Sequence, residues 1–467
     1  MKFSDYIKFL NSELNRNNIE DDSQILEWIE NKNKSIKTNI KRSNLSELNN
    51  WFYDERIGNI KHRSGNFFSI LGIEISSDNK IHEQPIIKQP EIGFLGIIVK
   101  EIDNIFYFLM QAKIEPGNIN KVQISPTLQA TKSNFQQIHK GSKPKYFEYF
   151  KNAKPKNILF DTLQSEQGNK FLKKRNRNIV VKVTNDIEVL DNYKWMSLRQ
   201  IKHLMKYDNY VNMDTRTVIS NIQYNFFENK FTQLEKETIK NKVRDNKFAK
   251  SMIAENGFYI DLIEVKNDMN NIKMLDNTKI RKKKLHELKA WQISDNIIYN
   301  KIKKGFQVIF CDIEIEGREV NSWGQPLLKP AGIELIAFLV KDINGIKHFL
   351  CKYTKEPGIF DTVEIGPTLH VLEEEPSLTD YVSNYTYNKI HEGENIIKYV
   401  LLSEEGGRFY HEENRNIILE ADNELKINKI CEKYKWLTLG QINFLINNDS
   451  YVNIQARNLT ALISMGD

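Results

Sequence analysis

The feature that most constrains the fold of this chain is an internal repeat. Nine short segments of the first half recur in the same order in the second half, at a displacement of 238 to 241 residues. They include EPG, PTL, YKW and YVN, which begin at residues 115, 126, 193 and 210 and again at 356, 367, 434 and 451. Nine ordered matches at one spacing do not arise by chance, and the unit is far longer than a solenoid repeat. The chain therefore holds two copies of one folded module.

Each copy is predicted to be an α+β module. Runs of β-branched and aromatic residues at 66–75 and 178–183 predict strands, and the runs on either side of Asp103-Asn104 predict a hairpin. The same hairpin is predicted again around Asn344-Gly345. Ser197 and Gln200 match a capping box ahead of a helix.

Four parts of the chain follow from this pattern. Residues 1–50 are predicted to be an N-terminal helical segment, with a further short helix at 44–51. Residues 51–220 and 285–467 are the two copies. Residues 221–284, which are charged and rich in Asn and Lys, are predicted to be a helical connector that packs on both copies.

Composition excludes several classes of protein. The sequence has no apolar stretch of 18 residues and no secretory signal, so we expect a cytoplasmic protein that does not span a membrane. The three cysteines, Cys311, Cys351 and Cys431, are far apart and have neither disulfide nor metal-ligand spacing. The net charge of +6 is modest for 467 residues, and the basic residues are not interleaved with an aromatic platform, so we expect no nucleic acid partner.

The common catalytic motifs are absent from the sequence. It contains neither GxGxxG nor GxxxxGK[ST], which argues against a dinucleotide-binding dehydrogenase and a P-loop kinase. It also lacks HExxH and GxSxG, the signatures of zinc proteases and of α/β-hydrolases.

What remains is a set of polar side chains in loops that follow predicted strands, the usual position of binding chemistry. The stretch from Gln111 to Asn134 is polar, is broken by Pro116-Gly117 and Pro126, and follows the predicted hairpin directly. In the first copy the set comprises Lys113, Glu115, Gln129, Thr131, Lys132, Asn134, His139, Gln164, Glu166 and Gln167.

A basic run, Lys173 to Arg177, follows this set. Guanidinium groups bind phosphate oxygens in a bidentate manner, so the run is either a diphosphate site or a solvated surface stretch. The second copy has His411, Glu412 and Glu413 at this place, so the two copies cannot bind an anion equally well.

Other candidates also have two interpretations. His139 is either a structural hydrogen-bonding residue or a general base. Glu115 and Glu356 either hold a Pro-Gly turn or take part in proton transfer. Trp51 either packs in the core or stacks on a nucleobase.

The motifs QAKIEPGN, QISPTLQATKSNF, LQSEQGNKFLKKRNRN and LSEEGGRFYHEENRN resemble the signatures of the NDP-hexose 2,3-dehydratases. The resemblance extends from about residue 51 to residue 458, apart from 221–284. It implies a tandem duplication with a fold related to Nudix hydrolases, and a homodimer. The sequence has no Nudix box, so a hydrolase magnesium site is not implied.

The resemblance also implies a reaction. The substrate would be a nucleoside-diphosphate 4-keto-6-deoxyhexose, usually dTDP-linked, such as dTDP-4-keto-6-deoxyglucose. A base removes the C3 proton, the C4 ketone accepts the electrons, and the C2 hydroxyl leaves with help from an acid. The product is a 3,4-diketo-2,6-dideoxy sugar, which a downstream 3-ketoreductase would consume. Because the ketone is the electron sink, we expect no cofactor and no metal.

The first copy is predicted to be the working site. Glu115, His139 and Glu166 are the candidates for proton transfer, and the predicted substrate-binding residues are Trp51, Lys113, Gln129, Thr131, Lys132, Asn134, Gln164, Gln167, Lys174, Arg175 and Arg177. A second pocket is predicted from Glu356, Thr368, Ser403, Glu404, Arg408, His411 and Arg415. The second copy has His370 in place of Gln129, so it either binds a nucleotide sugar without converting it or lends residues to the first pocket.

Two alternatives from other functional classes remain open at the level of sequence. One is a nucleotide-sugar binding protein without activity. The other is a Nudix-like hydrolase that cleaves the diphosphate.

Overall fold

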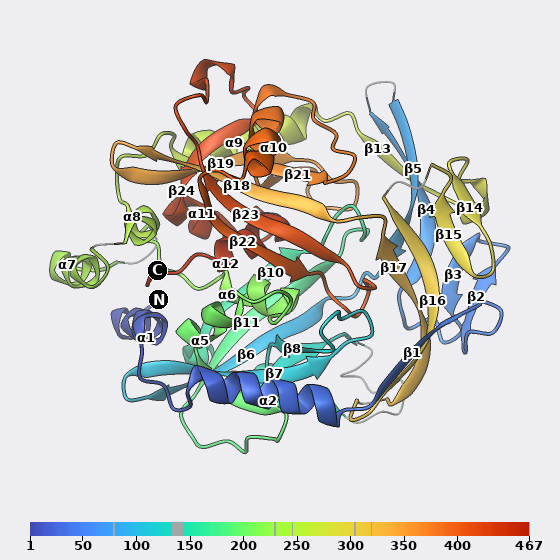
Figure 1. Cartoon of the computed structure of the whole chain (residues 1–467), viewed down its shortest axis with the longest axis horizontal. Helices are drawn as coiled ribbons and strands as arrows, with labels where there is room; N and C mark the ends of the chain where they lie inside the picture. The colour runs from blue at the N-terminus through green and yellow to red at the C-terminus, as the bar shows by residue number, and fades with distance from the viewer. Residues whose placement is uncertain are drawn as a thin grey trace.

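The chain forms two large and two small β-sheets with helices between and around them (Figure 1). The structure, a computed structural model, describes residues 1–77, 80–132, 143–227, 230–244, 246–302, 305–318 and 320–466. The α+β duplication predicted from the sequence is confirmed, whereas the relation to Nudix hydrolases stays a prediction.

Each repeat contributes one seven-stranded mixed sheet, in which the predicted hairpin is confirmed as β6–β7 and again as β18–β19. The central strands are buried on both faces, as their continuous apolar runs require. The first sheet contains β6 (Gly93–Ile102), β7 (Ile105–Ile114), β8 (Val122–Ser125), β9 (Leu128–Ala130), β10 (Ile158–Ser165), β11 (Arg175–Val183) and β12 (Tyr193–Ser197). The second contains β18 (Glu334–Ile343), β19 (Ile346–Thr354), β20 (Glu364–Gly366), β21 (Leu369–Leu372), β22 (Ile396–Ser403), β23 (Glu413–Glu420) and β24 (Tyr434–Thr438).

The two small sheets exchange a strand. β1 (Thr38–Ser43) pairs with β16 of the second repeat, and β13 (Lys279–Lys283) pairs with β4 of the first. The remaining strands are β2 (Trp51–Asp54), β3 (Asn59–His62), β4 (Ser69–Ser77) and β5 (Lys80–Lys88) in one sheet, and β14 (Trp291–Ile293), β15 (Ile297–Asn300), β16 (Phe306–Ile315) and β17 (Ser322–Pro330) in the other. β1 lies within residues 1–50 and β13 within residues 221–284, two segments predicted to be helical, so each small sheet also takes a strand from outside the predicted copies.

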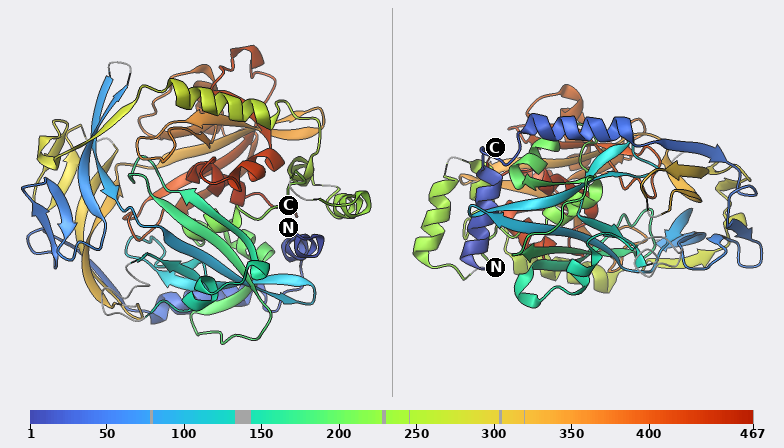
Figure 2. Two further views of the ribbon diagram at one scale, coloured as in Figure 1. Left: turned by 180° about the vertical axis from the view of Figure 1, so that it is seen from behind. Right: turned by 90° about the horizontal axis from the view of Figure 1, so that it is seen from below.

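Helices lie in the centre of the molecule and around the large sheets (Figure 2). They are α1 (Phe3–Leu14), α2 (Asp22–Ser35), α4 (Phe147–Lys151), α5 (Leu198–Leu204), α6 (Met213–Ile219), α7 (Gln233–Lys242), α8 (Lys247–Ile253), α9 (Leu262–Leu275), α10 (Tyr381–Glu392), α11 (Leu439–Ile446) and α12 (Ile454–Ala461), with 3-10 turns at Pro155–Asn157, Leu285–Glu287 and Ile427–Lys429. The two termini lie on the same side of the molecule at opposite ends of α1 (Figure 2). The capping box at Ser197 is confirmed. The short helix predicted at 44–51 is wrong, because residues 45–50 form turns and 51 begins β2. In the part of the chain that is described, no helix has the length and apolar character needed to cross a membrane.

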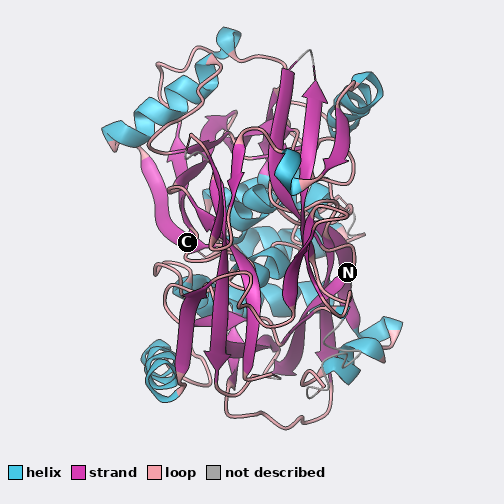
Figure 3. Ribbon diagram, turned by 90° about the vertical axis from the view of Figure 1, so that its right-hand side faces the viewer, coloured by secondary structure: helices cyan, strands magenta, loops and turns pink. Residues whose placement is uncertain are grey.

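The sheets surround a group of central helices (Figure 3). Two buried arginines and two crossing loops join the halves. Arg216 of α6 donates to Ser403 O at 2.6 Å, and Arg457 of α12 donates to Ser165 O at 2.6 Å. The amide of Gly117 donates to Gly406 O at 2.7 Å. In the equivalent contact, the amide of Gly358 donates to Gly168 O, also at 2.7 Å. Each repeat thus inserts a loop into the site region of the other.

Candidate active site

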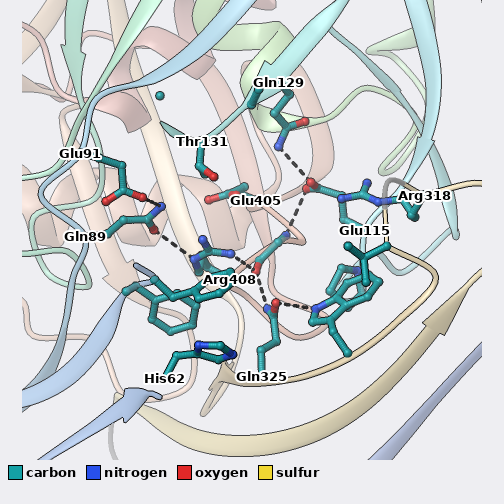
Figure 4. Close-up of a pocket in the computed structure, with 18 of the residues that line it drawn as sticks. His62, Gln89, Glu91, Glu115, Gln129, Thr131, Arg318, Gln325, Glu405 and Arg408 are labelled. Atoms are coloured by element: carbon teal, nitrogen blue, oxygen red, sulfur yellow. Dashed lines mark hydrogen bonds between the residues drawn. The ribbon is translucent and has the colours of Figure 1, made fainter. Parts of the chain in front are cut away.

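A cavity of about 330 Å³ lies between the large sheet of the first repeat and the crossing loop of the second (Figure 4). Its walls come from the ends of β7, β9 and β11, from the start of α6, and from both small sheets. The second repeat contributes residues 405–408 and part of 318–325. The site is therefore built from both repeats.

Glu115 stands just beyond the end of β7, where three donors hold its carboxylate. Lys113 Nζ lies 3.1 Å away, Gln129 Nε2 donates at 3.0 Å, and the amide of Gly407 donates at 3.1 Å. Burial would raise the pKa of Glu115, but the positive charges of Lys113 and Arg318 and these hydrogen bonds lower the pKa below its usual value. Glu115 is therefore ionised at neutral pH.

Glu405, on the crossing loop, has the opposite electrostatic character. It is half-buried in the cavity wall, and none of the described residues donates a hydrogen bond to its carboxyl group. Burial raises the pKa of Glu405, Arg408 offsets this in part, and the negative charge of Glu115 raises the pKa further. The cavity thus contains one carboxyl group whose surroundings favour the ionised form and another whose surroundings favour the protonated form.

The two arginines of the cavity come from the second repeat. Arg408 donates from Nε to Gln89 Oε1 at 3.1 Å and lies over the Phe68 ring, 4.3 Å from its centre. Arg318 donates to Ile114 O at 3.0 Å. Both guanidinium groups line the cavity, where they are suited to an anionic ligand.

The predicted basic run is divided by the strand alternation of β11. Lys174 lines the cavity and donates to Glu91 O at 2.5 Å, and burial lowers its pKa. Arg177 instead pairs with Asp161 at 2.7 Å, and Arg175 lies over the Phe360 ring at 4.1 Å. The structure does not bring the three predicted phosphate ligands together.

The other residues predicted for the first site fall into three groups. Trp51, Gln129 and Thr131 line the cavity, although the Trp51 indole donates to Gly324 O at 2.7 Å and is only 4% exposed. Glu166, Gln164 and Gln167 are buried outside the cavity lining, and burial raises the pKa of Glu166 to about 7. Lys132 is exposed, and Asn134 and His139 lie outside the described residues.

The second pocket stays a prediction, and Glu356 and Glu404, two of the residues predicted for it, both interact electrostatically with His370. Arg408 lines the cavity of the first repeat. Glu356 accepts from the Gly168 amide at 2.7 Å, and Glu404 accepts from Asn414 at 2.7 Å. The Thr368 hydroxyl hydrogen-bonds to both β18 and β19, and Ser403 hydrogen-bonds to Gln123. His411 stacks on Tyr410, and Arg415 forms an ion pair with Glu373.

Sequence reasoning named Arg408 only for a second pocket, and it missed the wall residues Glu405, Arg318 and Asp214. Glu405 and Arg408 belong to a recognised motif, SEEGGR, but the motif gave no sign that this loop enters the other repeat. Arg318 and Asp214 stood outside every motif considered, and both line the cavity. A loop crossing of this kind could not be derived from the periodicity of the sequence.

Comparison with known proteins identifies the family of this chain. The family model for NDP-hexose 2,3-dehydratase matches residues 22–222 and again 263–463. A protein of Amycolatopsis orientalis named dTDP-4-dehydro-6-deoxy-alpha-D-glucopyranose 2,3-dehydratase is 32% identical over 455 residues, which cover 94% of this chain and 89% of that protein. A protein of the same name from Streptomyces violaceoruber is 33% identical, covering 93% and 95% of the two chains. This chain belongs to the NDP-hexose 2,3-dehydratase family.

Proposed function

We propose that this protein removes the C2 hydroxyl of a nucleoside-diphosphate 4-keto-6-deoxyhexose, and that the nucleotide is dTDP. The names of the relatives support the substrate class. The observation that supports the chemistry is the pair of carboxyl groups, Glu115 and Glu405, in one cavity with their pKa values shifted in opposite directions. Environments that separate two such pKa values are typical of an acid and a base.

In this proposal Glu115 is the base. Its carboxylate removes the proton from C3, and the electron pair moves into the C4 ketone as an enolate. Lys113, whose Nζ lies 3.1 Å from Glu115, is near enough to donate to the enolate oxygen as charge develops. An aligned base contributes roughly 10²–10⁴-fold to the rate.

Arg408 and Arg318 bind the diphosphate, together with Lys174. Binding of the diphosphate orients the sugar ring and supplies the interaction energy that holds C3 near the base. A homodimer and a downstream 3-ketoreductase stay predictions.

The test is conversion of dTDP-4-keto-6-deoxyglucose by the purified protein, with the product trapped by an NADPH-dependent 3-ketoreductase. The expected product has lost the C2 oxygen, as measured by mass spectrometry. The matched control is dTDP-glucose, which has no ketone to accept the electrons and should not be converted. Binding without loss of oxygen would instead favour an inactive binding protein. Metal-dependent release of dTMP would favour a hydrolase.

A further inference from the structure

We propose that Glu405 is the acid that protonates the C2 hydroxyl as it leaves, so that the second repeat supplies half of the catalytic machinery. This inference rests on the proposed dehydration and assigns a specific step to a residue of the other repeat.

The crossing loop fixes Glu405 in the cavity from both sides. On one side the Gly117 amide donates to Gly406 O at 2.7 Å, and on the other the His411 amide donates to Gly117 O at 2.9 Å. The Gly407 amide, next to Glu405, donates to Glu115 at 3.1 Å. Backbone contacts therefore fix Glu405 relative to the proposed base.

The two carboxyl groups face the same small space beside Gly407. A Cβ atom at this position would lie 2.7 Å from Glu405 Oε1 and 3.5 Å from Glu115 Oε1. Glycine leaves this space open. Since C2 and C3 of a hexose are bonded neighbours, two groups that converge on one point can address the C3 proton and the C2 oxygen of one ring.

The surroundings of Glu405 favour its protonated form. Burial and the charge of Glu115 raise its pKa, against the lowering effects of Arg408, Lys113 and Lys174. Glu166 and Asp214, two more buried acids nearby, also interact with Glu405. A carboxyl group whose pKa is raised, and to which none of the described residues donates a hydrogen bond, is suited to donate its proton.

The step balances without any further reactant. The enolate re-forms the C4 ketone, its electron pair forms the C2–C3 double bond, and the C2–O bond breaks. Glu405 gives its proton to the departing oxygen, which leaves as water. The 2,3-enol then tautomerises to the 3,4-diketone.

A substrate with a different leaving group isolates this role. The test compares dTDP-4-keto-6-deoxyglucose with its 2-deoxy-2-fluoro analogue, because fluoride leaves without needing a proton. Glu405→Gln should lower turnover of the hydroxyl substrate about 10²–10⁴-fold and leave fluoride release within about threefold of wild type. The variant should also continue to exchange the C3 proton with D₂O, since the base is intact.

Three further variants make the result decisive. Glu405→Asp, which keeps the acid on a shorter side chain, should recover part of the activity. Glu412→Gln removes another buried acid of the same repeat, whose pKa burial raises to about 8 but which does not line the cavity, and should leave both activities unchanged. Glu115→Gln should lose both water and fluoride elimination together with C3 exchange.

The outcomes separate this inference from the proposed function. Equal loss of both leaving groups in Glu405→Gln, with the fold intact by circular dichroism, would overturn the assignment of Glu405 as the acid. Failure of the wild-type protein to convert either substrate would instead overturn the proposed function. The pH profile adds a second criterion: hydroxyl elimination should fall as the pH rises through the pKa of Glu405, and fluoride elimination should not.

Discussion

The cavity of the first repeat and the corresponding region of the second repeat have the same backbone fold but different side chains. Where the first repeat has Gly93 and Gln129, the second has Glu334 and His370. His370 Nε2 lies 2.6 Å from Glu334, so these two side chains pair with one another. In the first repeat, Gln129 is bonded to Glu115.

The electrostatics differ accordingly. Burial would lower the pKa of His370, but Glu334 raises it to about 9, and His370 in turn lowers the pKa of Glu334 to about 2 against the effect of burial. In the second repeat the charges of Glu334 and His370 therefore neutralise one another. In the cavity of the first repeat, cationic side chains are available to bind a ligand. Duplication preserved the fold in both copies, while a few substitutions of side chains separated their chemistry.

The largest expected effect tests which repeat provides the base. Glu115→Gln should reduce turnover about 10²–10⁴-fold, because an amide cannot accept the C3 proton. Glu356→Gln, the corresponding change in the second repeat, should cost far less. Steady-state kinetics with the ketoreductase trap measures both, and a comparable loss in Glu356→Gln would move the working site to the second repeat.

Transferring a residue of the second repeat to the first tests the role of cavity space and charge. Gly93→Glu introduces a carboxylate beside an anionic ligand, and a Cβ at this position already lies 2.8 Å from Asn176 Oδ1. Repulsion between like charges costs several kcal/mol, so we expect binding to weaken about 100-fold or more. Titration calorimetry with dTDP measures this, and unchanged affinity would show that the ligand binds elsewhere.

Arg408→Lys gives the crossing loop of the second repeat the residue that the crossing loop of the first repeat has at the corresponding position, Lys170. A lysine keeps the charge but loses the planar fork and the stacking on Phe68, so KM should rise about tenfold with kcat little changed. The matched control is Lys170→Arg, which should leave KM as it is. A fall in kcat alone would contradict a binding role for Arg408.

The crossing loops should be equivalent in stability even though they differ in chemistry. A Cβ at Gly117 would lie 1.6 Å from Phe409 O, and a Cβ at Gly358 would lie 1.7 Å from Phe171 O. Each change to alanine should therefore destabilise the fold by about 1–3 kcal/mol, as measured by denaturant unfolding. A large difference between the two would mean that the loops do not contribute symmetrically.

The smallest effect concerns the ion pair of the second repeat. The stabilisation from His370 is complete below pH 6.5 and is lost as the pH rises through about 9, and that from Glu334 is complete above pH 4.5 and is lost as the pH falls through about 2. The Tm difference between wild type and His370→Gln should therefore be largest between pH 4.5 and 6.5. A difference that does not change with pH would mean that the pair is not ionised.

Much of the fold could be predicted from local patterns. The hairpin at 103–104 and the capping box at Ser197 depend on residues that are near one another in sequence, and both are confirmed. The helix predicted at 44–51 failed, because this stretch is too short to form a stable helix without packing support, and its apolar residues Leu45 and Leu48 fit equally well into turns against the small sheets.

The candidate site could be predicted only in part. Lys113, Glu115 and Gln129 could be predicted because they lie on or just after strands β7 and β9 of the same sheet, so their closeness is encoded locally. Arg175 and Arg177 failed to reach the cavity because the alternation of a strand sends neighbouring side chains to opposite faces. The run is part of a strand from Arg175 onward, whereas the prediction treated it as a loop.

The sequence by itself determined the duplication, the strand and hairpin pattern and the family, since these depend on periodicity, turn chemistry and motif identity. Only the tertiary structure decided that Glu405 and Arg408 of one repeat complete the cavity of the other. The contact between Gly407 and Glu115 joins residues 292 positions apart. Such a pairing follows from the burial of whole sheet faces and the exchange of strands between them, and no local pattern encodes it.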